Sequence, residues 1–125
     1  MPIPINRNIT ATVFGGDAEV ENSAYDGKRI GETEPCVAIP GRVKVPQLVG
    51  LRNSNNGKVL VCPVRDVGPW NTNDPYWILG RRPQAESGLD HTSRKTNKAG
   101  IDLSPEAARQ LGIKGMGLVD WWFVS

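Results

Sequence analysis

The sequence contains little of what metal sites, membrane spans and nucleic-acid surfaces are built from. It has two cysteines and one histidine, His91, and their spacing matches no zinc-binding pattern. No apolar run approaches the roughly 18 residues of a membrane-spanning helix, and Met1–Pro4 shows no charged-then-apolar secretion signal. A net charge of +2 without a basic stripe is too small to indicate a nucleic-acid partner. We therefore expect no metal, no other cofactor, no membrane span and no nucleic-acid partner.

The two cysteines, Cys36 and Cys62, leave two outcomes open. In an oxidising compartment they can form a disulfide. Otherwise both are expected to be buried thiols, because a free cysteine behaves as a small apolar side chain.

What the chain does have is a series of short apolar runs separated by glycine and proline. Its 125 residues fit one domain with one core, and we assign residues 1–8 to a loose lead-in and residues 9–125 to that domain. The 14 glycines and 10 prolines follow no repeat, which favours many short strands and turns over disorder. The expected strands are residues 9–14, 37–40, 47–52, 58–67, 101–103 and 118–124.

Two turn signals are specific enough to predict local structure. Asn56-Gly57 joins two of the expected strands, and these residue types supply the positive φ angles of a tight hairpin. Ser104 is a good N-cap, Pro105 suits the first helical position, and Gly112 ends the helix. We therefore expect a short helix between the last two strands.

The stretch Val64–Trp70 places an acid at the edge of the sheet. Asp66 ends an apolar strand and Gly68-Pro69 follows it, so the backbone must turn away where a ligand can approach. Residues 68–100 then carry almost no apolar periodicity. They are expected to run over the surface as a long loop.

Several motifs, taken in order, resemble families of double-psi β-barrel proteins that act on cell-wall polysaccharide. Ala11–Gly16 resembles the opening strand of expansins. Asn56–Lys58, Val64–Pro69 and Ile101–Ala108 resemble rare lipoprotein A. The resemblance runs from about residue 10 to residue 124.

This resemblance implies a mostly β fold: a small six-stranded double-psi β-barrel with one or two short helices and a long surface loop. Some members of these families cleave the glycan strands of peptidoglycan as lytic transglycosylases, and others are endoglucanases. Others, including the expansins, bind or loosen wall polymers without evident hydrolysis. We accordingly expect a monomer whose partner is a polysaccharide, peptidoglycan or a related glycan, in the periplasm or at the cell wall outside the cell.

Two aspartates match acids of these families. Asp66 matches the acid of the Asp-Arg-Gly-Pro motif of rare lipoprotein A, and Asp102 resembles the conserved acid of expansins and the catalytic acid of barrel endoglucanases. Inverting hydrolysis needs an acid and a base with carboxyls about 6.5–9.5 Å apart, whereas one carboxyl can serve both roles in a transglycosylase. The alternative is structural: Asp66 accepts backbone N–H groups in its turn, and Asp102 holds the helix entry or pairs with an arginine.

The chain also departs from these families. Val67 follows Asp66 where rare lipoprotein A has an arginine, and Val37–Pro40 stands where that family carries an Ala-His pair. The segment from Asn71 to Asn97 has no counterpart there.

Aromatic and amide side chains in two polar loops are the candidate sugar-binding groups. Sugars present apolar C–H faces that stack on exposed rings, while amides bind hydroxyl groups. The expected substrate-binding residues are Tyr25, Trp70, Asn71, Asn73, Tyr76 and Trp77. The alternative is that the rings cap the barrel as a satellite core. On the last strand, Trp121 and Trp122 are expected to face opposite sides.

Three hypotheses of different classes follow. The first is cleavage of cell-wall glycan by Asp66 and Asp102. The second, motivated by the missing histidine, is a non-catalytic, expansin-like carbohydrate-binding module. The third is a component of a phage or secretion particle that contacts the wall. The deciding geometry is whether the two carboxyls open onto one shared groove.

Overall fold

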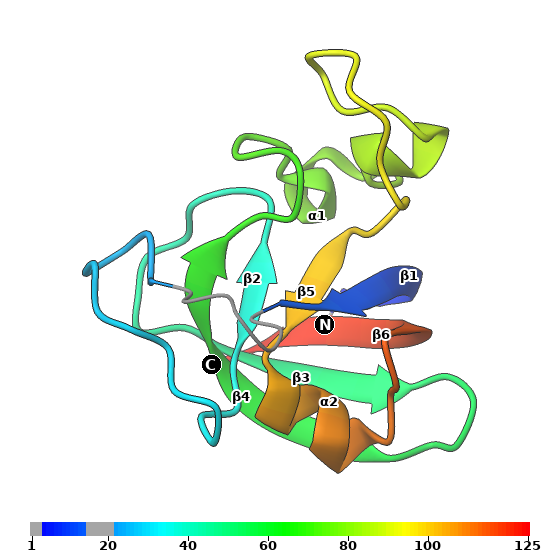
Figure 1. Ribbon diagram of the computed structural model, residues 1–125. Coiled ribbons are helices and arrows are strands. Elements are labelled where there is room, and N and C mark those ends of the chain that lie inside the picture. Colours follow the sequence, from blue (N-terminus) through cyan, green and yellow to red (C-terminus); the bar gives the residue numbers. More distant parts are fainter. Residues whose placement is uncertain (1–3, 15–21) are drawn as a thin grey trace.

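The computed structural model describes residues 4–14 and 22–125, and most of its elements are strands. The elements are β1 (Asn6–Val13), β2 (Val37–Ile39), β3 (Leu48–Asn53), β4 (Val59–Val67), α1 (Tyr76–Leu79), the short 3-10 helix η1 (Gln84–Ser87), β5 (Ile101–Leu103), α2 (Pro105–Leu111) and β6 (Met116–Val124). The strands close into a barrel in the order β1-β5-β2-β4-β3-β6 (Figure 1). The prediction of a mostly β, six-stranded barrel with one or two short helices is confirmed.

The strands lie around the barrel in an order different from their order in the chain. β1 runs parallel to β5 and β2 runs parallel to β4, whereas the other four pairs are antiparallel. β1 begins at Asn6, which pairs with Trp121. Residues 6–8 therefore belong to the barrel and not to the lead-in expected for residues 1–8. Gly15 and Gly16, at the end of the expansin-like opening motif, lie outside the described residues.

Apolar side chains that alternate along the strands fill the barrel, because successive strand residues point to opposite faces. On β6, Val119 and Trp121 are fully buried, and Phe123 packs against the same core. Trp121 is the largest side chain that is fully buried. The predicted division of β6 into an inner and an outer face is thus confirmed.

The two local turn predictions are confirmed, one of them with a difference. Ser104 caps α2, because its Oγ accepts a hydrogen bond from the Ala107 N–H at 3.2 Å, and Gly112 ends the helix with a φ of 72°. In the β3–β4 hairpin only Gly57, and not Asn56, has a positive φ. A hydrogen bond of 2.9 Å from the Gly57 N–H to the Asn53 carbonyl closes a turn wider than the tight type that was expected.

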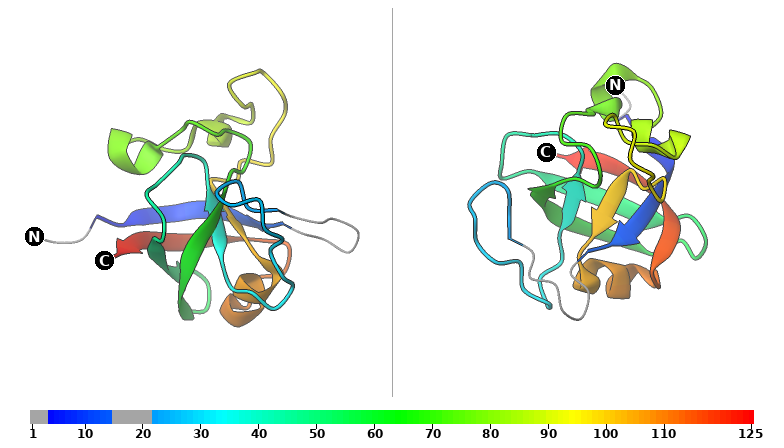
Figure 2. Two further views of the ribbon diagram at one scale, coloured as in Figure 1. Left: turned by 90° about the vertical axis from the view of Figure 1, so that its left-hand side faces the viewer. Right: turned by 45° about the horizontal axis from the view of Figure 1, so that its top comes forward.

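The excursion, residues 68–100, covers one end of the barrel, and α2 lies at the opposite end. The views in Figure 1 and Figure 2 agree on this arrangement. The excursion contains α1, η1 and a projecting loop. Among the described residues, no helix is long and apolar enough to cross a membrane.

Cys36 and Cys62 are free, buried thiols in two different places. Cys62 belongs to the barrel core, whereas Cys36 packs with Phe14, Ile30 and Ala38 in a second cluster. The structure therefore shows the second of the two outcomes left open by the sequence. Burial raises the pKa of each thiol to about 12.

We expect a thiol reagent at pH 8 to leave both cysteines of the folded protein almost unreacted. The thiolate is the reactive form, and a thiol with a pKa of about 12 is almost entirely protonated at that pH. The measurement is the absorbance of released chromophore with and without urea, which should show two thiols per chain only after unfolding. Rapid labelling of the folded protein would contradict this burial.

Candidate functional site

A β-bulge in β4 turns Asp66 out of the barrel core. Cys62 and Val64 point inward, so simple alternation would point Asp66 inward as well. However, β2 pairs Val37 with Val64 and the next residue, Ala38, with Asp66, which leaves Arg65 as an extra residue in β4. Such an insertion re-aims the side chain that follows it. The carboxylate of Asp66 therefore lies on the outer face of the barrel, on the same side as Ala38.

Asp66 and Asp102 lie in one row across four neighbouring strands. Ala38 on β2 pairs with Asp66 on β4 and with Asp102 on β5, and Asp102 pairs in turn with Thr12 on β1. We call Thr12, Asp102, Ala38 and Asp66 the acid row. Since adjacent strands are about 4.8 Å apart, the Cα atoms of the two aspartates are about 9–10 Å apart. The methyl group of Ala38 is the only side chain of the row between the two acids.

Asp102 is held in an environment that favours its protonated form. Burial is the largest cause that raises the pKa of Asp102, and the negative charge of Asp66 raises it further. A hydrogen bond from the Thr12 hydroxyl to Oδ1 acts in the opposite direction but does not offset these effects. Asp102 pairs with no arginine within the described part of the chain.

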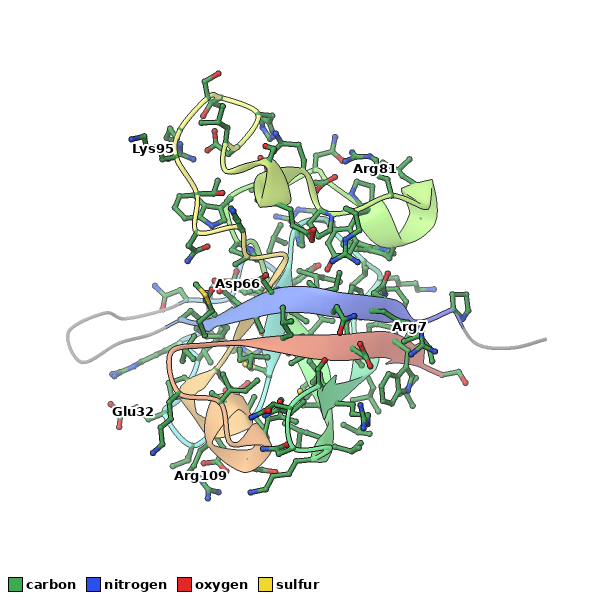
Figure 3. All side chains as sticks on the ribbon, turned by 90° about the vertical axis from the view of Figure 1, so that its right-hand side faces the viewer. Arg7, Glu32, Asp66, Arg81, Lys95 and Arg109 are labelled. Atoms are coloured by element: carbon green, nitrogen blue, oxygen red, sulfur yellow. The ribbon has the colours of Figure 1, made fainter. Side chains whose placement is uncertain are left out.

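Asp66 is oriented by the loop that precedes β2. Its Oδ1 accepts a hydrogen bond of 2.9 Å from the Ala24 N–H, while its Oδ2 has no donor among the described residues. Asp66 as a whole residue is 7% exposed. Figure 3 shows Asp66 at the end of the barrel from which the excursion rises, with Lys95 at the far end of that excursion. The structural alternative is met in kind but not in place, because the backbone N–H that Asp66 accepts comes from the loop before β2 and not from the turn after Asp66.

A hollow of about 270 Å³ lies along β4 and includes Val64 and Arg65, but neither Asp66 nor Asp102 lines it, so it is not a groove that the two acids share. It is lined by Tyr25, Asp26, Val45, Pro46, Pro63, Val64 and Arg65. The Tyr25 hydroxyl accepts a hydrogen bond of 3.1 Å from the Val43 N–H, and the guanidinium of Arg42 lies 5.3 Å from the centre of the Tyr25 ring. Tyr25 is thus fixed at the wall of this hollow, and its role in substrate binding stays a prediction.

Tyr76 belongs to the core, whereas Trp77 packs against the core and also lines a hollow of about 470 Å³. Tyr76 is 1% exposed, its hydroxyl donates to the Gly100 carbonyl at 2.8 Å, and it accepts a hydrogen bond from Trp121 Nε1 at 2.9 Å. Trp77 is half-buried and packs edge-on against Trp121 and Phe123. The expected stacking of Tyr76 on a sugar is wrong for this structure, because no face of the buried ring is accessible. The satellite-core alternative describes Tyr76, and the binding role of Trp77 stays a prediction.

Asn71 also serves the structure of the excursion. It is 1% exposed, its Nδ2 donates to Gln84 Oε1 at 2.8 Å, and its Oδ1 accepts a hydrogen bond from the His91 N–H at 3.2 Å. Because Asn71 is buried, its amide is not accessible to a hydroxyl group of a sugar at the surface. Asn73 is exposed, and Trp70 is half-buried with its indole N–H bonded to Asn97.

Thr12 is the member of the acid row that sequence reasoning missed. Its position in an apolar strand is unremarkable, and its contact with Asp102 spans 90 positions of sequence. Only the parallel pairing of β1 with β5 brings the two together. Within the described residues, no group of three or more histidine, cysteine or acidic side chains has the arrangement of a metal site.

The fold and this site define a small six-stranded β-barrel domain with two aspartates in a row on its outer face. The chain belongs to the family described as "Domain of unknown function (DUF8814)", whose model matches residues 6–122. A Streptomyces papain inhibitor of solved structure is similar in fold, with 21% sequence identity and a TM-score of 0.56. That match covers 99% of this chain and all of the inhibitor chain. No curated protein matches the sequence significantly.

Proposed function

We propose that this domain cleaves the glycan strands of a cell-wall polysaccharide, with Asp102 as the acid and Asp66 as the base. The observation that carries the proposal is the acid row. Asp66 and Asp102 both pair with Ala38, so their side chains lie on one face, and only the methyl group of Ala38 separates them within the row. The resemblance to rare lipoprotein A and the expansins names the substrate class. Such a substrate places the protein in the periplasm or at the cell wall.

The chemistry needs one proton donor and one proton acceptor. Asp102, whose pKa is raised, gives its proton to the glycosidic oxygen as the bond to the anomeric carbon breaks. Asp66 removes a proton from the attacking group through its free Oδ2. That group is water in hydrolysis or the 6-hydroxyl of the same sugar in a lytic transglycosylase. The Cα separation of about 9–10 Å is compatible with the carboxyl separation of about 6.5–9.5 Å in inverting enzymes.

Digestion of purified peptidoglycan sacculi tests the proposal. We expect soluble fragments, and mass spectrometry will show either anhydro-sugar ends, the product of transglycosylation, or new reducing ends, the product of hydrolysis. The digestion should be run at high protein concentration and several pH values, since Asp102 must be protonated. If no new ends form while the protein still binds the sacculi, the expansin-like binding module replaces the enzyme.

A second candidate is inhibition of a peptidase, favoured by the structural neighbour and by the projecting loop, residues 88–97. The carboxylate of Asp90 accepts hydrogen bonds from the N–H groups of Thr92 and Arg94, the Thr92 hydroxyl and the Arg94 side chain. A loop held in one conformation loses little entropy on binding. A papain assay with the same preparation distinguishes this candidate, because an inhibitor lowers peptidase activity in a saturable manner and releases no glycan fragments.

A further inference from the structure

The indole of Trp122 lies flat on the outside of the barrel. A Cβ atom placed on Gly50 would lie 2.3 Å from Cε2, 2.5 Å from Cζ2 and 2.5 Å from Nε1 of Trp122. These three bonded ring atoms are almost equally distant from the Cβ position. The Cβ position of Gly50 therefore lies above the face of the ring and not beside its edge. The absence of a side chain at Gly50 is what lets the ring rest on the sheet. Trp122 is half-buried, so one face lies against β3 and the other is directed outward.

Apolar residues of the neighbouring strands extend this flat surface. Gly50 pairs with Val61 on β4 and with Trp122 on β6, so these residues form one cross-strand row on the outer face. The next row contains Leu48, which pairs with Pro63. Val61 is 50% exposed and Leu48 is 42% exposed. We call Trp122, Val61 and Leu48, together with the underlying Gly50, the stacking platform.

Polar groups border the platform on one side. The row beyond Gly50 contains the exposed Val59 together with Arg52 and Asp120, whose charged groups lie 3.9 Å apart. Arg7 lies at the same distance from Asp120. A ring face bordered by groups that donate and accept hydrogen bonds suits a pyranose, which has apolar C–H faces and hydroxyl groups around its edge.

The platform borders the hollow described above. Pro63 belongs both to the row of Leu48 and to the lining of the 270 Å³ hollow, which also contains Tyr25 and Arg65. Along β4, Val61 and Asp66 are five positions apart, a distance of about 15 Å. A polysaccharide chain is long enough to span this distance, whereas a single sugar is not.

We propose that the stacking platform is an anchoring subsite for a polysaccharide chain, in which a sugar ring stacks on the outer face of Trp122. This inference rests on the proposed glycan substrate and adds a second contact point remote from the two acids. A protein partner is a poorer occupant, because even with Val59 the four apolar side chains are far from the roughly 800 Å² that each partner buries in a standard protein interface.

The test is co-sedimentation of the protein with purified peptidoglycan sacculi, with the bound fraction measured against sacculus concentration. Trp122→Ala is expected to raise the apparent Kd about 10-fold or more, which corresponds to about 1.4 kcal/mol. Trp122→Phe keeps a ring and should restore most of the binding. Gly50→Ala keeps the tryptophan but forces its indole off the sheet, so it should bind as weakly as Trp122→Ala.

Ile78→Ala is the matched control, because Ile78 is a large apolar side chain that is 76% exposed on α1, outside the platform. It should bind like the wild type, and thermal unfolding followed by circular dichroism checks the fold of every variant. Equal binding of wild type and Trp122→Ala, or no binding of the wild type, overturns the inference. Binding that depends on Trp122 without release of fragments supports the platform and rejects cleavage, so the two proposals fail separately.

Discussion

Replacing Asp102 with asparagine is expected to abolish glycan cleavage and to make the protein more stable at neutral pH. Asparagine cannot donate the proton that the leaving oxygen needs, and loss of a general acid typically costs about 10²–10⁴-fold in rate. The gain in stability has a separate cause. Burial and the charge of Asp66 raise the pKa of Asp102, so its ionised form is disfavoured in the folded protein. The neutral amide of asparagine is free of this penalty and still accepts the Thr12 hydrogen bond.

The expected gain is about 0.5–2 kcal/mol in the free energy of unfolding, the range of single stabilising substitutions. It should depend on pH in a defined direction. Because the folded pKa of Asp102 lies above its unfolded value of 3.8, the contribution of Asp102 to the stability of the wild type is fully present below pH 3.8 and is lost as pH rises through the folded pKa. Urea unfolding at several pH values should therefore show the two curves diverging as pH increases.

Asp90→Asn is a control with the opposite sign. Burial alone would raise the pKa of Asp90, but hydrogen bonds from Arg94 and Thr92 hold that pKa well below its usual value. The asparagine variant should therefore be less stable than the wild type at neutral pH, with unchanged cleavage.

Retention of cleavage by Asp102→Asn would contradict the assignment of Asp102 as the acid.

The second large effect is expected from the two adjacent tryptophans of β6. Trp121→Ala should lower the free energy of unfolding by about 3–5 kcal/mol, because it leaves a cavity in the barrel core. Trp121 is completely buried, packs edge-on against three aromatic rings and donates its indole N–H to the Tyr76 hydroxyl. Since a small domain has about 5–15 kcal/mol in total, this loss is a large part of its stability.

Trp122→Ala provides the comparison within the same strand. Its ring is on the outer face and half-buried, so the expected loss is about 1 kcal/mol. Urea unfolding followed by circular dichroism measures both variants. Equal destabilisation would mean that the two faces of β6 are not divided as the structure shows.

Local structure was predictable wherever the cause is local. The cap at Ser104, the stop at Gly112 and the inner face of β6 follow from neighbouring residues, and all three predictions are confirmed. Asn56 does not take the positive φ that was expected, because the turn is wider than a tight hairpin turn. The Asn53 carbonyl accepts the N–H of Gly57, four residues later.

The candidate site was predictable only in part, because its geometry depends on long-range pairing. The motifs indicate Asp66 and Asp102, but the bulge at Arg65 and the neighbouring position of Thr12 depend on β2 and β1. Trp70 and Tyr76 occur in the same polar segment, with no apolar periodicity to separate them. Tyr76 is buried because its hydroxyl reaches both Gly100 and Trp121, contacts that no local pattern encodes.

The circular order of the strands also determines when the acid row can exist during synthesis. Its members come from residue 12 to residue 102, and β6, the last strand, closes the barrel between β1 and β3. A nascent chain that has emerged only as far as the hairpin has no partner for β1 and no second carboxyl group beside Ala38. Assembly of the row therefore waits for the C-terminal quarter of the chain, and the many non-local pairings place this domain among the slower-folding small proteins.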